Sequence, residues 1–168
     1  MALTMYTASV PVFVRGLSNL SGLLAKGLAS AEARDIDPAV LITARLAPDM
    51  HPLSRQVQIA SDSAKGAGAR LAGAEVPSFA DSETTFPELQ ARIRNTIDFL
   101  QTLTAGQFEG AEEKTVTLPL PGGSVDLTGQ EFLFGFALPN FFFHITTAHA
   151  ILRHNGVPIG KMDYLGGR

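Results

Sequence analysis

Apolar residues recur at spacings of three and four residues through four long segments of this chain, the repeat of an α-helix that buries one face. The third of these segments shows the repeat most clearly, with Leu89, Ile93, Ile97, Leu100 and Leu103. It follows a capping box in which Thr85 and Glu88 satisfy each other's free backbone N–H groups. This pattern predicts a long helix that ends near Gly106.

Two further helices are predicted before it. The first covers about residues 3–33, where leucines repeat at helical spacing and Pro11 either starts or bends the helix. Asp37 and Pro38 are typical of the start of a short helical turn over residues 39–42. The second long helix then runs from Leu53 to about residue 72, with Pro52 in its first turn.

The segment after the third helix changes character. Residues 115–118 and 124–127 flank Pro121-Gly122-Gly123, which indicates a small β-hairpin or a hairpin-like loop. A second capping box, from Thr128 to Glu131, opens the fourth helix, which Pro139 is expected to kink or restart. That helix should end at Asn155-Gly156, and residues 157–168 are expected to form an extended loop packed against the helices.

These segments predict an all-α fold. Amphipathic helices joined by modest connections favour a bundle of four main helices, with the hairpin or hairpin-like loop before the last helix. A chain of 168 residues is long enough for one continuous hydrophobic core. We therefore expect one domain over residues 1–168.

Charge and composition exclude several classes of function. The net charge is −3, and lysines and arginines are scattered, so the chain lacks the basic surface that nucleic acids or anionic membranes require. The chain has no cysteine, which excludes disulfides, thiolate zinc sites and a cysteine nucleophile. Neither a nucleic acid nor a membrane is an expected partner.

Two segments need to be weighed as membrane or export signals. Residues 132–152 carry no formal charge, but Pro139, His144 and His149 would be costly in lipid, so a buried bundle helix explains the run better. The uncharged N-terminus has no preceding lysine or arginine and is interrupted by Pro11, unlike a secretory signal. We expect a cytoplasmic protein.

Several strings carry a family resemblance. They are Ala47-Pro48-Asp49-Met50, residues 55–60 (RQVQIA), residues 140–147 (NFFFHITT), residues 151–157 (ILRHNGV) and the tail from Gly160 to Gly166. In these strings the chain resembles a bacterial domain-of-unknown-function branch of the DinB/YfiT-like superfamily, and the resemblance covers essentially the whole chain. The motifs are specific for membership and say little about activity.

The resemblance implies a four-helix bundle with one long crossover, commonly a homodimer. In better-known superfamily members three histidines bind a divalent metal, often nickel or zinc. One of these histidines comes from the second helix and two from a His-x-x-x-His pair on the fourth. Some members are thiol-dependent transferases or isomerases, and others are hydrolases.

The histidine spacing of this chain departs from that pattern. His144, His149 and His154 are separated by five residues each, so successive side chains point about 140° apart around a helix. The position four residues after His144 is Ala148. We therefore expect the fourth-helix half of the metal site to be missing, and we expect no metal cofactor.

A weaker alternative keeps a divalent metal, nickel or zinc, on His144 and His51. Asp62 shares a helical face with His51 but lies about 16 Å further along the axis. Asp62, Arg55 and Gln58 could instead form a polar cluster facing His144. The candidate pocket residues are thus His144, His51, Asp62 and Gln58, although His144 is equally well explained as a structural residue that joins two helices.

The phenylalanines of the fourth segment point to self-association. Phe141, Phe142 and Phe143 are consecutive, so they point three ways around a helix and at least one must leave the core. Large exposed apolar side chains usually meet a partner. The remaining members of the group are Phe132, Phe134 and Phe136, which are expected in the core or at an interface.

Two functional hypotheses follow. The first is a degenerate DinB-like bundle that forms a homodimer and binds a small molecule in a pocket near His144. The alternative is a metal- or thiol-dependent transferase or hydrolase in which His144, His51 and Asp62 contact the substrate or metal. The sequence leaves open whether the protein is an enzyme.

Overall fold

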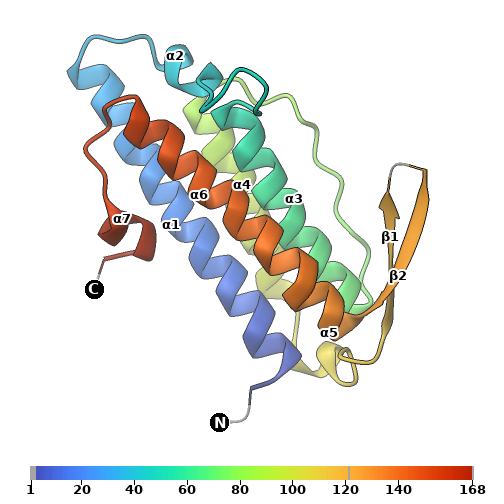
Figure 1. Ribbon diagram of the computed structural model, residues 1–168. Helices are drawn as coiled ribbons and strands as arrows, with labels where there is room; N and C mark the ends of the chain where they lie inside the picture. The colour runs from blue at the N-terminus through green and yellow to red at the C-terminus, as the bar shows by residue number, and fades with distance from the viewer. Residues whose placement is uncertain (1–2, 121, 168) are drawn as a thin grey trace.

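The computed structural model describes residues 3–120 and 122–167 (Figure 1). Its long helices lie side by side and enclose the hydrophobic core. They are α1 (Met5–Ala33), α3 (Leu53–Ala72), α4 (Phe86–Thr102) and α6 (Leu138–His154). The mostly helical fold predicted from the apolar spacing is confirmed.

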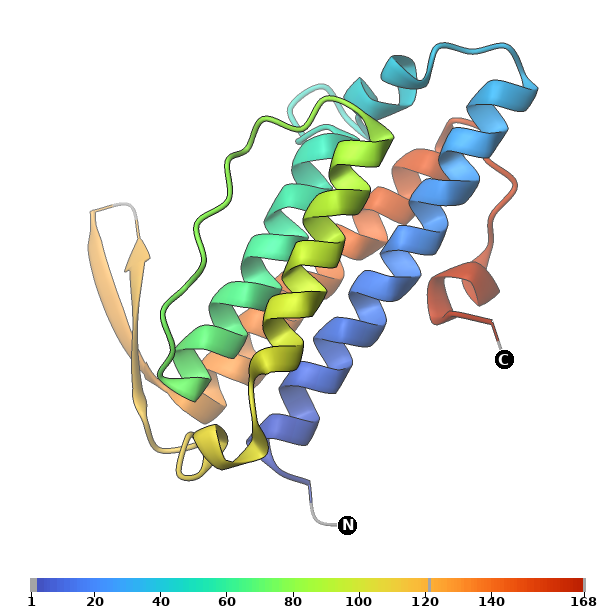
Figure 2. The same ribbon diagram turned by 180° about the vertical axis from the view of Figure 1, so that it is seen from behind.

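The connection between α3 and α4 is long and runs back along the molecule. Residues 73–85 leave the lower end of α3 and return to its upper end before α4 begins (Figure 2). As a result α3 and α4 run in the same direction, whereas α1 and α6 run in the other (Figure 1). This connection is the long crossover that the family resemblance implied.

The predicted helix starts are confirmed. Both capping boxes form, at Thr85–Glu88 and at Thr128–Glu131. The short helix α2 (Pro38–Thr43) is capped by Asp37, whose carboxylate accepts the N–H of Ala39 at 2.9 Å. Helix α4 ends at Thr102, before the predicted Gly106, because residue 103 is extended and a separate 3-10 turn, η1 (Ala105–Phe108), follows.

Pro11 does not start the first helix. Helix α1 begins six residues earlier, at Met5, where the side chain of Thr4 accepts the N–H of Thr7. The helix continues through Pro11, which is exposed. Pro52 lies just before α3 rather than within its first turn.

The predicted hairpin is confirmed. Strands β1 (Thr115–Leu120) and β2 (Gly123–Thr128) pair antiparallel, with Thr115 opposite Thr128. Val116 and Leu118 turn toward the helices and are buried. Their partners Val125 and Leu127 on β2 are partly buried against the same core, so the hairpin rests on the core through one face. Figure 1 shows the hairpin standing beside the lower part of α3. The turn residue Pro121 lies outside the described residues.

The fourth helical region is continuous but not uniform. A single turn, α5 (Gly129–Glu131), leads into a wider π-helical stretch, η2 (Phe132–Ala137), and then into α6. Pro139 lies directly after this stretch and has no backbone N–H to donate one turn back. The irregularity expected at Pro139 thus takes the form of a π-helical stretch before it.

The expectation of an extended tail is wrong in part, because residues Lys161–Leu165 form a short helix, α7. The carboxylate of Asp163 accepts the N–H of Gly160 at 2.7 Å and also pairs with Lys26 of α1. Asn19 donates to the carbonyl of Tyr164 at 3.0 Å. The contacts with α1 add to the local caps at Gly160 and Gly166 and hold this short helix against the bundle.

The phenylalanines divide as their spacing predicts. Phe132 and Phe141 are buried in the core. Four others are exposed: Phe134, Phe136, Phe142 and Phe143. Within the described residues no helix is both long enough and apolar enough to cross a bilayer.

Candidate functional site

His144 lies in the seam between α6 and α3. Its side chain is buried, with 8% of the residue exposed. The ring nitrogen Nδ1 lies 2.7 Å from Oε1 of Gln56, which projects from the first turn of α3 and is only 1% exposed. Nε2 of Gln56 in turn donates to the backbone carbonyl of His51 at 3.0 Å. Gln56 therefore connects the two candidate histidines.

This chain of hydrogen bonds determines which nitrogen of His144 carries the proton. The amide nitrogen of Gln56 is used by His51, so the amide oxygen faces the ring and Nδ1–H must donate to it. A neutral imidazole has one N–H, and Nε2 therefore presents a lone pair. Among the described residues no protein group donates to Nε2. His144 thus offers an acceptor to a ligand or a metal.

Burial keeps this imidazole neutral. Loss of hydration on burial, together with smaller electrostatic contributions from His51 and Arg55, lowers the pKa of His144 from 6.5 to about 4. At neutral pH the ring is uncharged. Beside it, the ring of Phe143 stands edge-on, with the two centroids 5.3 Å apart. His51 itself is exposed, as expected for a residue just before the helix.

Asp62 and Gln58 lie elsewhere. On α3, Gln58 and Asp62 are rotated by about 200° and 240° from Gln56, so they face away from His144. Nη2 of Arg92 on α4 lies 2.7 Å from Asp62, and Gln58 donates to Glu83 of the crossover at 2.9 Å. The polar cluster expected around Asp62 and Gln58 exists, but it does not face His144.

We call this second group the Arg92 cluster. It consists of Arg92, Asp62, Asp81, Glu83, Arg55, Gln58 and Lys65. The guanidinium of Arg92 is almost fully buried and contacts all three carboxylates, at 2.7 Å (Asp62), 3.0 Å (Asp81) and 2.9 Å (Glu83). Because Asp81 and Glu83 belong to the crossover, the cluster fastens residues 73–85 onto α3 and α4.

The geometry of α6 does not suit a three-histidine metal site. The helix is regular from residue 138 to 154, so His144 and His149 do not converge. The ring of His149 lies against Tyr164 of α7, with centroids 5.9 Å apart, whereas His144 contacts α3. Ala148, where a third ligand would lie, is fully buried and has no donor atom. In the described part of the chain no three His, Asp or Glu side chains are grouped as metal ligands.

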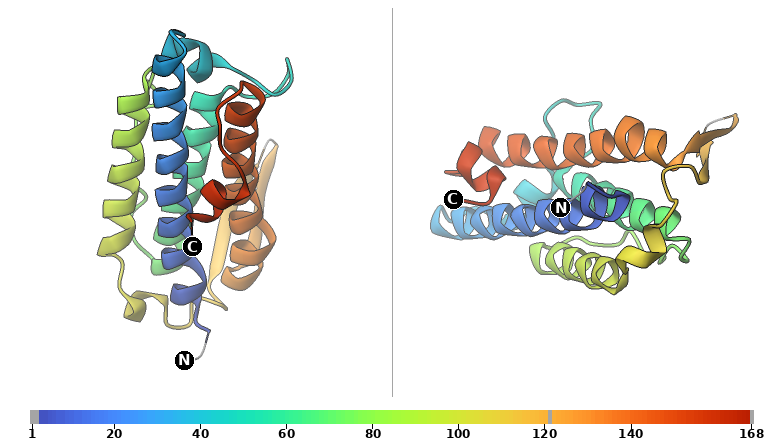
Figure 3. Two further views of the ribbon diagram at one scale, coloured as in Figure 1. Left: turned by 90° about the vertical axis from the view of Figure 1, so that its left-hand side faces the viewer. Right: turned by 90° about the horizontal axis from the view of Figure 1, so that it is seen from below.

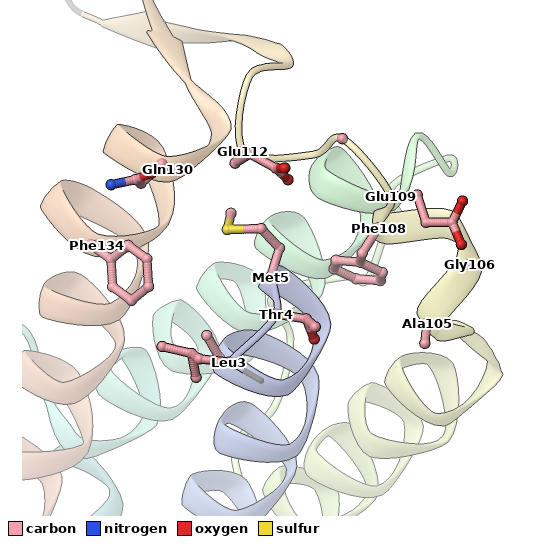
Figure 4. A pocket seen from close by; sticks show the side chains of 12 residues that line it. Leu3, Thr4, Met5, Ala105, Gly106, Phe108, Glu109, Glu112, Gln130 and Phe134 are labelled. Carbon is pink, nitrogen blue, oxygen red and sulfur yellow. The ribbon is translucent and has the colours of Figure 1, made fainter. Parts of the chain in front are cut away.

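Two cavities of ligand size lie away from His144. One, of about 730 Å³, is at the N-terminal end of α1. Figure 4 shows Leu3, Met5 and Phe134 on one side of it, Phe108 on the other, and Glu109 and Glu112 nearby. The second, of about 410 Å³, lies between α1, α6 and α7. Both fall within the size range of small-molecule sites.

Comparison with known families identifies the chain. Residues 5–165 match the model of a family described as a domain of unknown function, DUF1993. The chain belongs to the DUF1993 family. No curated protein matches this DUF1993 chain.

A solved structure supports the wider relationship. It is the crystal structure of a DinB family member protein from Shewanella denitrificans at 1.83 Å resolution, which is 44% identical in sequence. The similarity covers 97% of the DUF1993 chain and 92% of the other chain, with a TM-score of 0.91. The resemblance to the DinB-like superfamily inferred from the sequence strings is confirmed.

Gln56, which orients the ring of His144, was not among the residues predicted from the sequence. A signal was present, because Gln56 lies three residues after Leu53 and four before Ala60, on the apolar stripe of α3. A polar residue on such a stripe requires a buried partner. That partner is His144.

Proposed function

We propose that this DUF1993 protein is a dimeric small-molecule-binding module built on a DinB-type four-helix bundle, with the metal site reduced to two histidines. One observation carries the proposal: burial keeps His144 neutral and Gln56 orients it, so that its Nε2 lone pair is free, while the next turn of α6 supplies only Ala148. Two histidine ligands give a weak site compared with the three or four ligands of ordinary zinc centres.

The ligand suited to His144 is a small molecule that donates an O–H or N–H. Such a donor would complete the hydrogen bonding of the ring, since Nδ1 is already used by Gln56 and Nε2 accepts from no protein group that the structure describes. The ring of Phe143 supplies an apolar surface beside that acceptor. A metal ion would use the same lone pair, so the two kinds of ligand compete for one atom.

A phenol titration followed by NMR and an elemental analysis test this proposal. We expect phenol, an aromatic O–H donor, to shift the side-chain NMR signals of His144 and Gln56 in the wild-type protein. The same addition should leave Gln56 unshifted in His144→Phe. Elemental analysis of protein purified without a histidine tag should find no stoichiometric nickel or zinc, since the third ligand is missing.

The opposite results favour the alternative function, a metal- or thiol-dependent transferase or hydrolase. Its specific support is the neutral His144 imidazole, whose free Nε2 is the form that binds metals. One tightly held nickel or zinc per chain, lost in both His144→Ala and His51→Ala, would replace the binding proposal by this one. If phenol shifts only the NMR signals of other parts of the protein, the binding proposal is also contradicted.

The dimer is proposed from the exposed phenylalanines of the η2–α6 region. Phe136 and Phe143 are seven residues apart and both are exposed, which is unfavourable in a monomer in water. We expect light scattering to give twice the 17.8 kDa chain mass for the wild type and a single-chain mass for the double variant Phe136→Ser, Phe143→Ser. Val40→Ser changes an exposed valine on α2 and should leave the dimer intact. A single-chain mass for the wild type would contradict the dimer.

A further inference from the structure

The cavity between α1, α6 and α7 combines an apolar interior with a polar end. Val12 of α1, Phe142 and Ile145 of α6 and Leu165 of α7 supply apolar walls. Arg15 and Asn19 of α1 lie at the same cavity. Figure 3 shows α7 beside α1 and α6. Tyr164 and Leu165 of α7 line one side of the cavity. The volume is about 410 Å³, and the site is separate from His144.

Arg15 has unused hydrogen-bond donors at this cavity. Nη2 donates to the carbonyl of Leu165 at 3.0 Å, which leaves most of the five N–H groups of the guanidinium unused. No carboxylate among residues 3–120 and 122–167 forms an ion pair with Arg15. A guanidinium in this state can bind a carboxylate through two parallel hydrogen bonds.

The helices around the cavity carry few acidic residues that could neutralise Arg15. Helix α6 contains no aspartate or glutamate, and α1 has none before Glu32, near its end. Asp163 of α7 is already paired with Lys26 and with the N–H of Gly160. The walls therefore present a positive charge beside an apolar space, with no free carboxylate from α1, α6 or α7 to balance it.

We infer that this cavity is a binding site for an amphiphilic carboxylate, with the acid group on Arg15 and the hydrocarbon against Phe142 and Ile145. The complementarity of charge favours this occupant over a neutral or cationic molecule. Burial of the half-exposed Phe142 ring by the hydrocarbon adds apolar contact. Helix α7 forms one wall of the cavity and is held to α1, because Asn19 and Arg15 donate to the carbonyls of Tyr164 and Leu165.

Calorimetric titration of the full chain with decanoate and with decanol, both below their aggregation concentrations, tests the assignment. We expect the wild type to prefer decanoate by about tenfold, the scale of a charge-assisted hydrogen-bonded pair. Arg15→Gln should abolish this preference and leave decanol binding unchanged. Arg153→Gln makes the same change of charge on an exposed part of α6 and should keep the preference.

Two further variants separate recognition from structure. Arg15→Lys keeps the positive charge but cannot form two parallel hydrogen bonds, so it should retain only part of the preference. If decanol binding falls as much as decanoate binding in Arg15→Gln, Arg15 acts by holding α7, and the inference fails. Val12→Trp fills the cavity and should abolish binding of both ligands, so persistent binding would place the site elsewhere. If decanoate binding is lost at the protein concentrations at which the dimer forms, a second copy of the chain occupies the cavity and the inference fails.

Discussion

Replacing Arg92 by methionine is expected to destabilise the protein by about 3–5 kcal/mol, the cost of removing one partner from a buried ion pair. The guanidinium is almost fully buried and contacts Asp62, Asp81 and Glu83. Without it these three carboxylates face one another with only Lys65 and Arg55 nearby. Chemical denaturation at pH 7 measures the change in unfolding free energy.

If the loss of stability in Arg92→Met comes from charge, it should depend on pH. Burial opposes the ionisation of Asp81, but hydrogen bonds and charges from Arg55 and Arg92 hold its pKa below 3.8. A carboxylate with a lowered pKa stabilises the folded state above its unfolded pKa, and that stability is lost as the pH falls through the folded pKa. In Arg92→Met the carboxylate of Asp81 loses one of the charges that lower its pKa, so it protonates more readily. The difference between wild type and variant should therefore narrow below about pH 4.

Arg94 supplies the matched control. It lies two residues further along α4, is exposed, and forms no ion pair with any residue the structure describes. Arg94→Met should change stability by no more than about 0.5 kcal/mol. If the difference in unfolding free energy between the wild type and Arg92→Met stays constant from pH 7 to pH 3, the stability is lost through packing rather than charge. Protease cleavage within residues 73–85 should increase in Arg92→Met alone, because Asp81 and Glu83 lose their anchor.

The helices could be predicted because the information that forms them is local. Thr85 and Glu88 are three residues apart and cap α4 without help from other segments. Asp37 likewise caps α2. Helix α7 could not be predicted, because it depends on Asn19 and Lys26, which are more than 130 residues away in sequence.

The candidate site could be predicted only in part. His144 was identified by its place in the most apolar segment, and its separation from His149 followed from angular spacing alone. Its grouping with Asp62 and Gln58 required knowing how α3 is rotated against α4 and α6. Asp62 pairs instead with Arg92, a buried arginine whose role no local pattern indicates.

Lowering the pH from about 6.5 to about 4 is expected to cost the protein up to about 3 kcal/mol through His144 alone, because each pKa unit corresponds to 1.36 kcal/mol. The sign follows from the protonation states. Between these pH values the unfolded chain binds a proton at His144 that the folded protein does not. The destabilisation due to His144 is therefore absent above about pH 6.5, grows as the pH falls, and stops growing below about pH 4.

The variant His144→Gln isolates this contribution. A glutamine amide can still donate to Gln56 but does not titrate in this range. Denaturation of wild type and variant across pH 4–7 should show a wild-type slope that the variant lacks. The other three histidines remain in both proteins, so their contributions cancel in the difference. Parallel slopes would mean that His144 has the same pKa in the folded and the unfolded protein. In that case Nε2 would gain a proton as the pH falls below about 6.5, and burial would not protect the acceptor on which the proposed binding site depends.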